Sequence, residues 1–263
     1  MDYNYHTHTS WCRHAAGNAA DYVARAVECG IKHMGFSEHS PFVFPDGHDS
    51  GYRILPQETP QFIAEIEELR RKYQGIIDIK IGYELECYPK YFGDMVKKAV
   101  ECGAEYLILG HHFLGNEHPN GFKSMQRNTD EALLKEYVNS VLMGIKSGVF
   151  TYVAHPDIFN FRGDEKLYRN EMRKICIASK KYNVPLEINF LGIRESRNYP
   201  RDDFWAIAGK VGAPVTFGFD AHSPLAAYDG ESQKTAEDMV KRFGLNYIGK
   251  PELVLLKELK AQK

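Results

Sequence analysis

The sequence lacks the long apolar runs and the excess of one charge that mark several classes of protein. Its 263 residues include 33 lysines and arginines against 35 aspartates and glutamates, for a formal net charge of −2. No apolar run approaches the roughly 18–20 residues that a membrane-spanning helix needs, and the opening MDYNYHTHTS has no apolar stretch of the secretory type. We therefore expect a cytoplasmic protein with no membrane partner. The balanced charge argues against long nucleic acid as a partner.

Cysteine is also sparse, and its spacing excludes a disulfide framework. The cysteines are odd in number, scattered and without a CxxC pair; they are Cys12, Cys29, Cys87, Cys102 and Cys176. This usage is typical of reduced thiols in a cytosolic protein. Cys12, in a loop beside His14, could bind zinc as a thiolate, but a small buried thiol is the simpler interpretation.

The sequence does contain a regular alternation of short β-rich runs with amphipathic helical patterns. The expected strands span Tyr3–His6, His33–Ser37, Ile77–Tyr83, Glu105–Leu109, Thr151–Ala154, Leu186–Asn189 and Val215–Phe219. The expected helices span Ala19–Cys29, Thr59–Tyr73, Lys90–Cys102, Asp130–Ser147, Lys166–Tyr182, Asp202–Val211 and Ser232–Phe243. Seven such units with no linker predict one α/β domain over residues 1–263. We expect a (β/α)7 barrel or a closely related wound sheet, whose functional groups gather at the C-terminal ends of the strands.

An internal repeat ends several of these units on a residue type that binds metals. The run AVECG occurs at residues 26–30 and again at 99–103, and each copy leads through a strand to a histidine. Aligning Gly30 with Gly103 aligns His39 with His112, and so favours His112 over its neighbour His111. The same order recurs where a strand ends at His155. A glycine that ends a helix is routine, but a metal-type side chain after every such strand is not.

Two further pairs have a spacing that lets both side chains reach one ion. His6 and His8 follow the first strand, and Asp220 and His222 follow the last. Residues two apart in an extended chain point to the same side. The loop residue His14 could join them, although a solvated loop histidine explains it equally well.

One carboxylate occupies the end of the third strand. An acid that points into a barrel mouth is costly to bury unless it meets cations, and Glu84 can bridge two ions there. Glu86 has the same strand parity, and we expect it to orient a ligand or to lie at the surface. The remaining histidines, His33, His48 and His118, lack such a setting and are expected to be surface or packing groups.

The predicted ligand set is too large for one ion. It comprises His6, His8, His14, His39, Glu84, His112, His155, Asp220 and His222. A tetrahedral ion takes four ligands, so two or three divalent ions would share this set. The mixture of imidazole and carboxylate suits zinc, iron or manganese.

The order of these motifs resembles that of the PHP (polymerase and histidinol phosphatase) family of phosphoesterases. The resemblance runs through HTHTSWCRH, FSEHSP, GYELE, LGHHF, VAHPD and FGFDAHSP, and so covers nearly the whole chain. It implies a distorted seven-stranded barrel with a trinuclear site. Within the family, WCRHAAG, GHHF and the overall length are most similar to the monofunctional histidinol-phosphate phosphatases of histidine biosynthesis.

The resemblance also implies how the ligands divide among the ions. The first ion would take His6, His8, Glu84 and Asp220; the second Glu84, His112 and His155; the third His14, His39 and His222. A hydroxide bridging two ions would attack the phosphorus of L-histidinol phosphate. Glu84, Asp220 and His222 would then be the catalytic side chains.

A small phosphorylated substrate needs further contacts around the ions. Arginine pairs well with phosphoryl oxygens, and we expect Arg162, Arg194 and Arg197, which follow strand ends, to supply them. The ammonium or imidazole group of an amino-alcohol substrate could meet Glu187 or Asp157. Phe113 could stack against the imidazole ring.

Three other functions remain open from the sequence. The same metals would serve a hydrolase that acts on another phosphate ester, a phosphodiester or a carbonyl compound. A nuclease or proofreading domain should carry a basic track with exposed aromatic residues, which the charge balance does not favour. A non-enzymatic metal-binding protein should have coordinatively saturated ions, whereas catalysis needs an open position.

Overall fold

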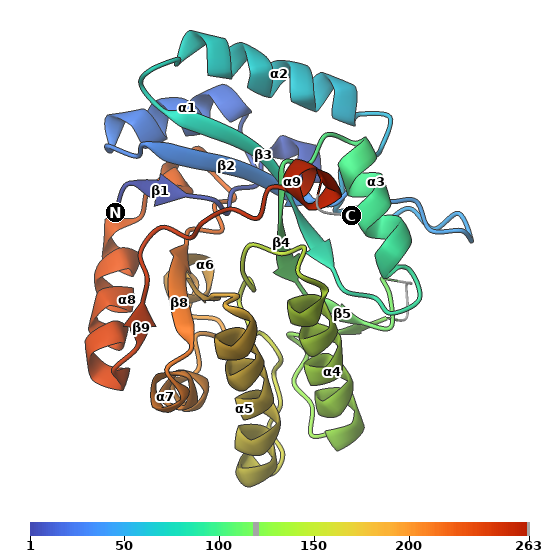
Figure 1. Cartoon of the computed structure of the whole chain (residues 1–263), viewed down its shortest axis with the longest axis vertical. Coiled ribbons are helices and arrows are strands. Elements are labelled where there is room, and N and C mark those ends of the chain that lie inside the picture. The colour runs from blue at the N-terminus through green and yellow to red at the C-terminus, as the bar shows by residue number, and fades with distance from the viewer. Residues whose placement is uncertain (118–120, 262–263) are drawn as a thin grey trace.

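Strands and helices alternate along the chain in the computed structural model, which describes residues 1–117 and 121–261 (Figure 1). The parallel strands are β1 (Tyr3–Asn4), β2 (His33–His39), β3 (Asp78–Glu86), β4 (Tyr106–Gly110), β7 (Leu186–Asn189), β8 (Pro214–Gly218) and β9 (Asn246–Tyr247). β5 (Phe113–Leu114) and β6 (Phe122–Lys123) pair antiparallel in a small separate ribbon.

Helices lie outside the curled sheet (Figure 1). They are α1 (Ala19–Glu28), α2 (Thr59–Lys72), α3 (Phe92–Glu101), α4 (Glu131–Ser147), α5 (Glu165–Tyr182), α6 (Phe190–Arg194), α7 (Asp202–Val211), α8 (Gly230–Phe243) and α9 (Leu256–Ala261), with 3₁₀ turns at Ser10–Cys12 and Pro224–Ala227. Each expected helix is present with ends shifted by at most a few residues. Asn18 caps α1 by accepting from the Asp21 amide, as the sequence indicated. None of the helices in the described ranges is long and apolar enough to cross a membrane.

Isolated bridges close the sheet into a ring. β1, β2, β3 and β4 are neighbours in that order, and β7 lies between the Val153 segment and β8. Val153 bridges to Leu109 on one side and to Leu186 on the other. Thr7, just beyond β1, bridges to Ala221, just beyond β8. Six strands and the Val153 segment thus form the expected distorted (β/α)7 barrel.

Two of the expected strands are shorter than predicted. The segment Thr151–Ala154 pairs through the single bridging residue Val153, because the backbone turns sharply at His155, whose φ is +30°, and Pro156 follows. β1 ends at Asn4 rather than His6. The Asn4 side chain accepts from the His6 amide at 3.1 Å and so replaces a ladder hydrogen bond.

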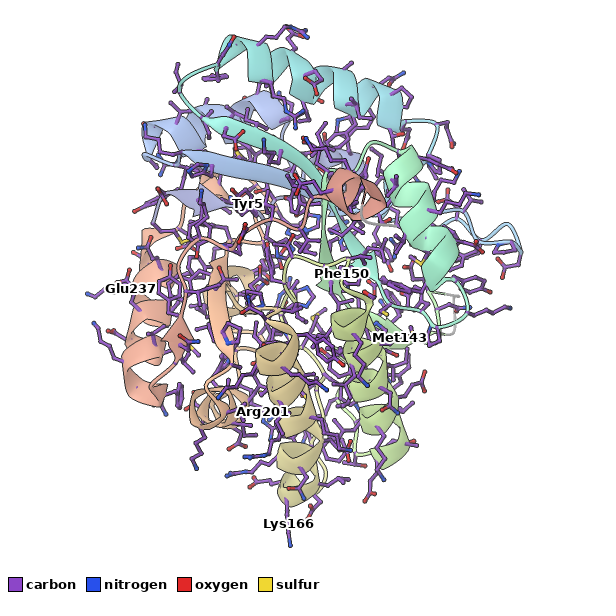
Figure 2. All side chains as sticks on the ribbon, in the orientation of Figure 1. Tyr5, Met143, Phe150, Lys166, Arg201 and Glu237 are labelled. Carbon is purple, nitrogen blue, oxygen red and sulfur yellow. The ribbon has the colours of Figure 1, made fainter. Side chains whose placement is uncertain are left out.

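Large aromatic residues fill the inside of the ring below the strand ends. Tyr3, Tyr5, Tyr106 and Tyr152 form one buried cluster with two small or aliphatic neighbours. The Tyr106 ring occupies space that a side chain on Gly35 or Gly82 would take, since a Cβ there would lie 2.0 or 2.3 Å from its atoms. Figure 2 shows Tyr5 among the inner side chains, whereas Lys166 and Glu237 project from the outer helices. The barrel is therefore a packed core and leaves its chemistry to the open end.

A buried ion pair fastens a long connection to that open end. Arg53, in the segment between β2 and α2, donates through Nε to Glu117 Oε2 at 2.8 Å, pairs through a second nitrogen with Oε1, and donates to the Ser40 carbonyl at 2.8 Å. The Tyr88 hydroxyl also donates to Glu117, at 3.0 Å. Arg53 and Glu117 are almost completely buried. The connection that follows His39 is thereby held against the loop after β5.

Replacing Glu117 with alanine should destabilise the protein by about 3–5 kcal/mol, because Arg53 is left charged and unpaired in the interior. Urea unfolding followed by circular dichroism measures this change. The matched control is Glu131→Ala, which removes an exposed partner of Lys135 and should change stability by less than about 1 kcal/mol. Equal effects of the two substitutions would show that the buried pair does not hold the connection.

Candidate metal centre

The nine predicted ligands come together at the C-terminal ends of the strands, although they are far apart in sequence. They lie at or just beyond the ends of the strands, except for His14, which follows the first 3₁₀ turn and approaches them from a loop. Five groups of three side chains have ligand atoms within 4.8 Å of one another, and together these groups contain all nine predicted ligands and Cys12. The folding of a parallel barrel therefore assembles the whole predicted set.

Glu84 stands at the middle of this set. Its Oε2 lies 3.6 Å from His6 Nε2, 3.4 Å from His8 Nε2 and 3.4 Å from His39 Nδ1. Its Oε1 lies 2.8 Å from His155 Nε2 and 3.6 Å from His112 Nε2. Because the two oxygens face different groups of imidazoles, this carboxylate has the geometry that a bridge between two ions requires.

Asp220 and His222 extend the cluster on the opposite side. Asp220 Oδ1 lies 3.5 Å from Nε2 of both His6 and His8 and 3.3 Å from His222 Nδ1. His222 Nε2 lies 3.0 Å from His14 Nε2, and these two rings group with His39. His14, His39 and His222 thus form a third group of ligand atoms, next to the loop that carries His14.

The donor atoms fit divalent metal ions better than they fit one another. His6 Nε2, His8 Nε2, His39 Nδ1 and Asp220 Oδ1 are buried and make no hydrogen bond. Orphaned buried polar atoms are costly. Two ligands about 2.1 Å from a tetrahedral ion lie about 3.4 Å apart, close to the separations of 3.3–3.6 Å between most of the neighbouring atoms around Glu84 and Asp220. The site is thus suited to bind divalent metals.

The protonation states of the clustered side chains also favour the binding of cations. Burial, together with the nearby His222, lowers the pKa of His8 to about 3, and burial holds the pKa of His39 well below its usual value. Both rings are therefore neutral, as metal ligation requires. Burial would raise the pKa of Glu84, but the rings of His112, His6 and His39 hold it well below the usual value, so Glu84 is a carboxylate.

Two further carboxylates orient the histidines from behind. His6 Nδ1 donates to Glu187 Oε1 at 2.7 Å, and His112 Nδ1 donates to Glu86 Oε1 at 2.6 Å. Each bond fixes the tautomer that turns Nε2 toward the cluster. Glu86 therefore orients a ligand, one of its two expected roles, and is not at the surface, because β3 runs on through it.

The prediction that Glu187 contacts substrate is wrong. Its side chain is fully buried, and its second oxygen accepts from the His155 amide at 3.0 Å and from the Asn189 side chain at 2.8 Å. Glu187 and Asn189 are two residues apart on one strand and so point to the same side, a sequence signal that could have revealed the inward direction of Glu187. Gly218 leaves the space that this carboxylate occupies, since a Cβ there would lie 1.7 Å from Oε1.

Other predicted contacts also lie away from the cluster. Asp157 is buried and accepts from the Arg201 amide and the Trp205 indole, and burial raises the pKa of its carboxyl group to about 6. Phe113 stacks on Tyr52, with ring centroids 5.6 Å apart. Neither residue lines the cavity above the cluster. Asp157 lies in a loop, where proximity to a strand end does not fix side-chain direction, and Phe113 belongs to the short strand β5, which the sequence did not predict.

The three arginines have different positions. Arg197 lines a cavity of about 300 Å³ that opens above the cluster. Arg194 pairs with Asp229 at 2.8 Å and reaches the Asp220 carbonyl at 3.4 Å, but it does not line the cavity. Arg162 is exposed and donates to Asn160 at 2.8 Å. The structure therefore contradicts the assignment of Arg162 to the site and leaves Arg197 as the arginine on the cavity wall.

The remaining histidines behave as expected where the structure describes them. His111 is buried against Tyr88 and Tyr137, with ring centroids 5.9 and 5.6 Å away, so it is a packing residue. His33 is partly buried beside an exposed aspartate, and His48 packs near Phe44. His118 lies outside the described residues.

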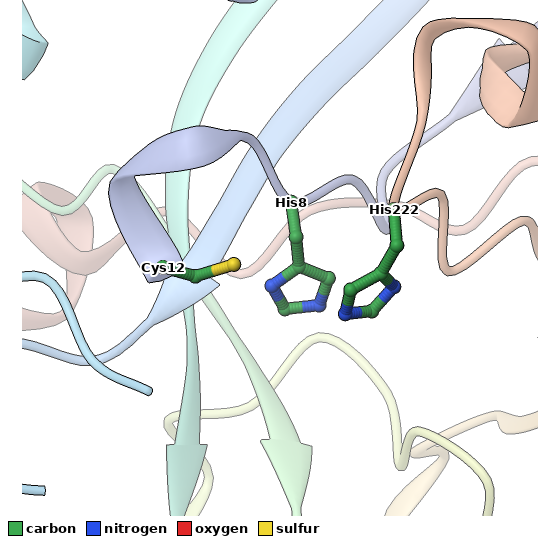
Figure 3. Close-up of side chains that lie close together, drawn as sticks. All are labelled: His8, Cys12 and His222. Carbon is green, nitrogen blue, oxygen red and sulfur yellow. The ribbon is translucent and has the colours of Figure 1, made fainter. Parts of the chain in front are cut away.

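The Cys12 side chain lies close to two residues of the cluster, His8 and His222 (Figure 3). Its sulfur, a ring nitrogen of His8 and one of His222 fall within 4.8 Å of one another. The thiol donates to the Thr9 carbonyl at 3.1 Å, and burial raises its pKa well above the usual value. Cys12 is thus a buried thiol, and all five cysteines are free.

Comparison with known families identifies the arrangement. The PHP domain family matches residues 4–190, which span the segments carrying seven of the nine clustered side chains. The chain belongs to the PHP domain family. The remaining two, Asp220 and His222, lie beyond the matched range, in the segment that directly follows β8.

Several PHP relatives are similar over most of their length. A Deinococcus radiodurans protein named "Probable histidinol-phosphatase" is 26% identical, covering 83% of this chain and 85% of the relative. The histidinol-phosphatase of Bacillus subtilis is 25% identical, covering 82% and 92%. A crystal structure of histidinol phosphate phosphatase from Lactococcus lactis, complexed with zinc, L-histidinol and phosphate, superposes with a TM-score of 0.69. It is 20% identical over 94% of this chain and 95% of that chain, and so shows that the fold is shared.

Gly110→Ala should reduce bound metal to well below that of the wild type, because the new methyl group would lie 2.3 Å from Glu84 Oε1 and displace the carboxylate. Metal content after dialysis, measured by plasma mass spectrometry, tests this. Gly93→Ala is the control, since its Cβ would meet nothing within 4 Å. Full metal content in the Gly110 variant would mean that the position of Glu84 is not critical.

Zinc binding to the metal-free protein at pH 7 should release protons. Although burial opposes it, the carboxylates of Glu84 and Glu86 raise the pKa of His112 to about 9, so this ring is protonated at pH 7 and must lose its proton to bind a metal. Zinc affinity should therefore fall as the pH is lowered and rise as it approaches 9. Titration calorimetry in two buffers of different ionisation enthalpy counts the protons, and a count of zero would contradict the assignment.

Proposed function

We propose that this protein is a metal-dependent phosphomonoesterase that hydrolyses L-histidinol phosphate to L-histidinol and phosphate. The observation that carries the proposal is the position of Glu84, with its two oxygens facing separate groups of histidines at the floor of the cavity. Relatives named histidinol-phosphatase at 25–26% identity over most of the chain support the same reaction. The reaction belongs to histidine biosynthesis, and we infer that the protein works in the cytoplasm.

The clustered side chains divide into three proposed ion positions. His6, His8, Glu84 and Asp220 would hold one ion, Glu84, His112 and His155 a second, and His14, His39 and His222 a third. Zinc, iron and manganese all suit these donors. When bound, the metals supply positive charge for the phosphoryl oxygens and acidify water for the attack on phosphorus.

The residues of the chain prepare the site for that reaction. Glu187 and Glu86 hold two imidazoles in the ligating tautomer. The neutral rings of His8 and His39 and the two carboxylates Glu84 and Asp220 offer lone pairs and negative charge to cations at the floor of the cavity. Arg197, at the wall, would donate to a non-bridging phosphoryl oxygen and orient the ester. The cavity, of about 300 Å³, suits a small ligand.

A panel of substrates tests the reaction class. Protein reconstituted separately with zinc, iron and manganese should release phosphate from L-histidinol phosphate with a higher kcat/KM than from phosphotyrosine, and it should barely cleave bis(p-nitrophenyl) phosphate. Chelator treatment should abolish turnover, and metal addition should restore it. Preferred cleavage of the diester, or full activity after exhaustive chelation, would reject the proposal.

Arg197→Met should lower kcat/KM for L-histidinol phosphate by about 10- to 100-fold, because a hydrogen bond between charged groups contributes roughly 1.5–3 kcal/mol. Metal content should stay unchanged, since Arg197 contacts no predicted ligand within the described residues. Arg162→Met is the matched control and should retain activity, as Arg162 is exposed and turned toward Asn160. Greater loss in the Arg162 variant would reverse the assignment.

A further inference from the structure

The cavity above the cluster has two chemically different walls. Six of the residues that line it are predicted ligands, which form its floor, and the other five form the rest of its wall: Met125, Leu191, Glu195, Arg197 and Tyr199. An ester whose phosphate lies at the floor and meets Arg197 would place its organic part beside the other four of these residues. The wall combines two apolar side chains, a tyrosine, a cation and an acid. Such a wall can recognise an organic group that is itself partly apolar and partly charged.

Glu195 is placed to recognise the charged part. It follows α6 directly, and its amide donates to the Leu191 carbonyl at 3.0 Å, so its backbone is fixed. The side chain is half exposed and pairs with Arg197 through Oε2, at 2.9 Å from Nε and 2.7 Å from the terminal nitrogen. Since both contacts use Oε2, the other oxygen can accept from a ligand in the cavity.

Other carboxylates near the cavity are committed elsewhere. Among the described residues that line it, Glu84 and Asp220 are the remaining acids, and both face imidazoles at the floor. Glu187 is fully buried with both oxygens in hydrogen bonds. Asp157 is enclosed by Arg201 and Trp205. Glu195 is thus the acid that a substrate cation can reach.

We propose that Glu195 determines specificity for phosphate monoesters that carry an ammonium group near the ester, by accepting a hydrogen bond from that ammonium. The inference rests on the proposed phosphatase function and adds to it the residue that recognises the leaving group. Arg197 and Glu195 then act as a matched pair, the arginine on the phosphoryl group and the glutamate on the amine. A substrate that is zwitterionic over this short distance would satisfy both charges at once.

Two substrates that differ only in the amine test the proposal. They are L-histidinol phosphate and its counterpart without the amine, 3-(imidazol-4-yl)propyl phosphate. Wild-type protein should prefer the first. Glu195→Gln keeps the size of the side chain and removes its charge, and it should lower kcat/KM for the amine substrate by about two- to fivefold, as the loss of a partly exposed ion pair does. The value for the counterpart should change by less than about twofold on the same grounds.

Two companion variants separate charge recognition from a structural effect. Glu195→Asp retains the charge and should restore part of the preference for the amine. Glu165→Gln removes an exposed acid on α5 that lies 3.8 Å from Arg169 and should leave both substrates unchanged. Folding of each variant is checked by circular dichroism, and because Glu195 is exposed, its substitutions are expected to fold.

Three outcomes would overturn the inference, and one of them also overturns the proposed function. If Glu195→Gln lowers kcat/KM equally for both substrates, the residue acts through Arg197 and does not recognise the amine. If wild-type protein shows no preference between the two esters, there is no amine recognition to explain. If metal-loaded wild-type protein hydrolyses neither ester, the phosphatase assignment itself fails.

Discussion

Burial of the Glu84 carboxylate among imidazoles is the constraint on which the open end of the barrel depends. Glu84 is 2% exposed, and its oxygens lie within 3.6 Å of five histidine nitrogens. A buried charge of this kind is tolerated only when cations and hydrogen bonds surround it. The orphaned nitrogens around it are costly for the same reason. Both costs disappear when divalent ions occupy the space between the donors, so the same arrangement that strains the metal-free protein creates affinity for metal.

The surrounding structure is adapted to keep that carboxylate and its neighbours in place. Gly110 and Gly218 leave room for Glu84 and for Glu187, the acid that orients His6. Asp220 and His155 adopt left-handed backbone conformations, with φ of +45° and +30°, which cost roughly 1–2 kcal/mol each for residues other than glycine. Strain of this kind persists where the surrounding fold determines the backbone. Here the tyrosine-filled interior below and the Arg53–Glu117 pair beside the site supply that rigidity.

Much of this arrangement follows from the sequence, because strand period and strand direction are strict rules. The glycine-anchored repeat selected His112 over His111, and the structure turns His112 toward Glu84 and buries His111 between tyrosines. The seven-unit barrel was likewise predictable from the alternation of elements. The alternation of side chains along a strand also explains Glu187. It lies two residues before Asn189 in β7, and both side chains point into the barrel.

Side chains in loops could not be predicted in the same way. Arg162 and Arg197 lie in loops, which impose no period on their side chains, and Arg194 ends the short helix α6, so the three arginines point in different directions although all of them follow strand ends. The connection between β2 and α2 shows no periodic pattern, so the burial of Arg53 against Glu117 became visible only in the folded chain. Glu195 was missed because its importance depends on the shape of the cavity. Such contacts depend on tertiary packing rather than on local sequence.

Anomalous diffraction from crystals of the zinc-reconstituted protein, collected on both sides of the zinc absorption edge, tests the central claim most directly. The account predicts strong anomalous peaks on both sides of the Glu84 carboxylate, each about 2.0–2.2 Å from one of its oxygens and within bonding distance of imidazole nitrogens. A map in which zinc lies elsewhere, or in which neither oxygen of Glu84 contacts an ion, would contradict it.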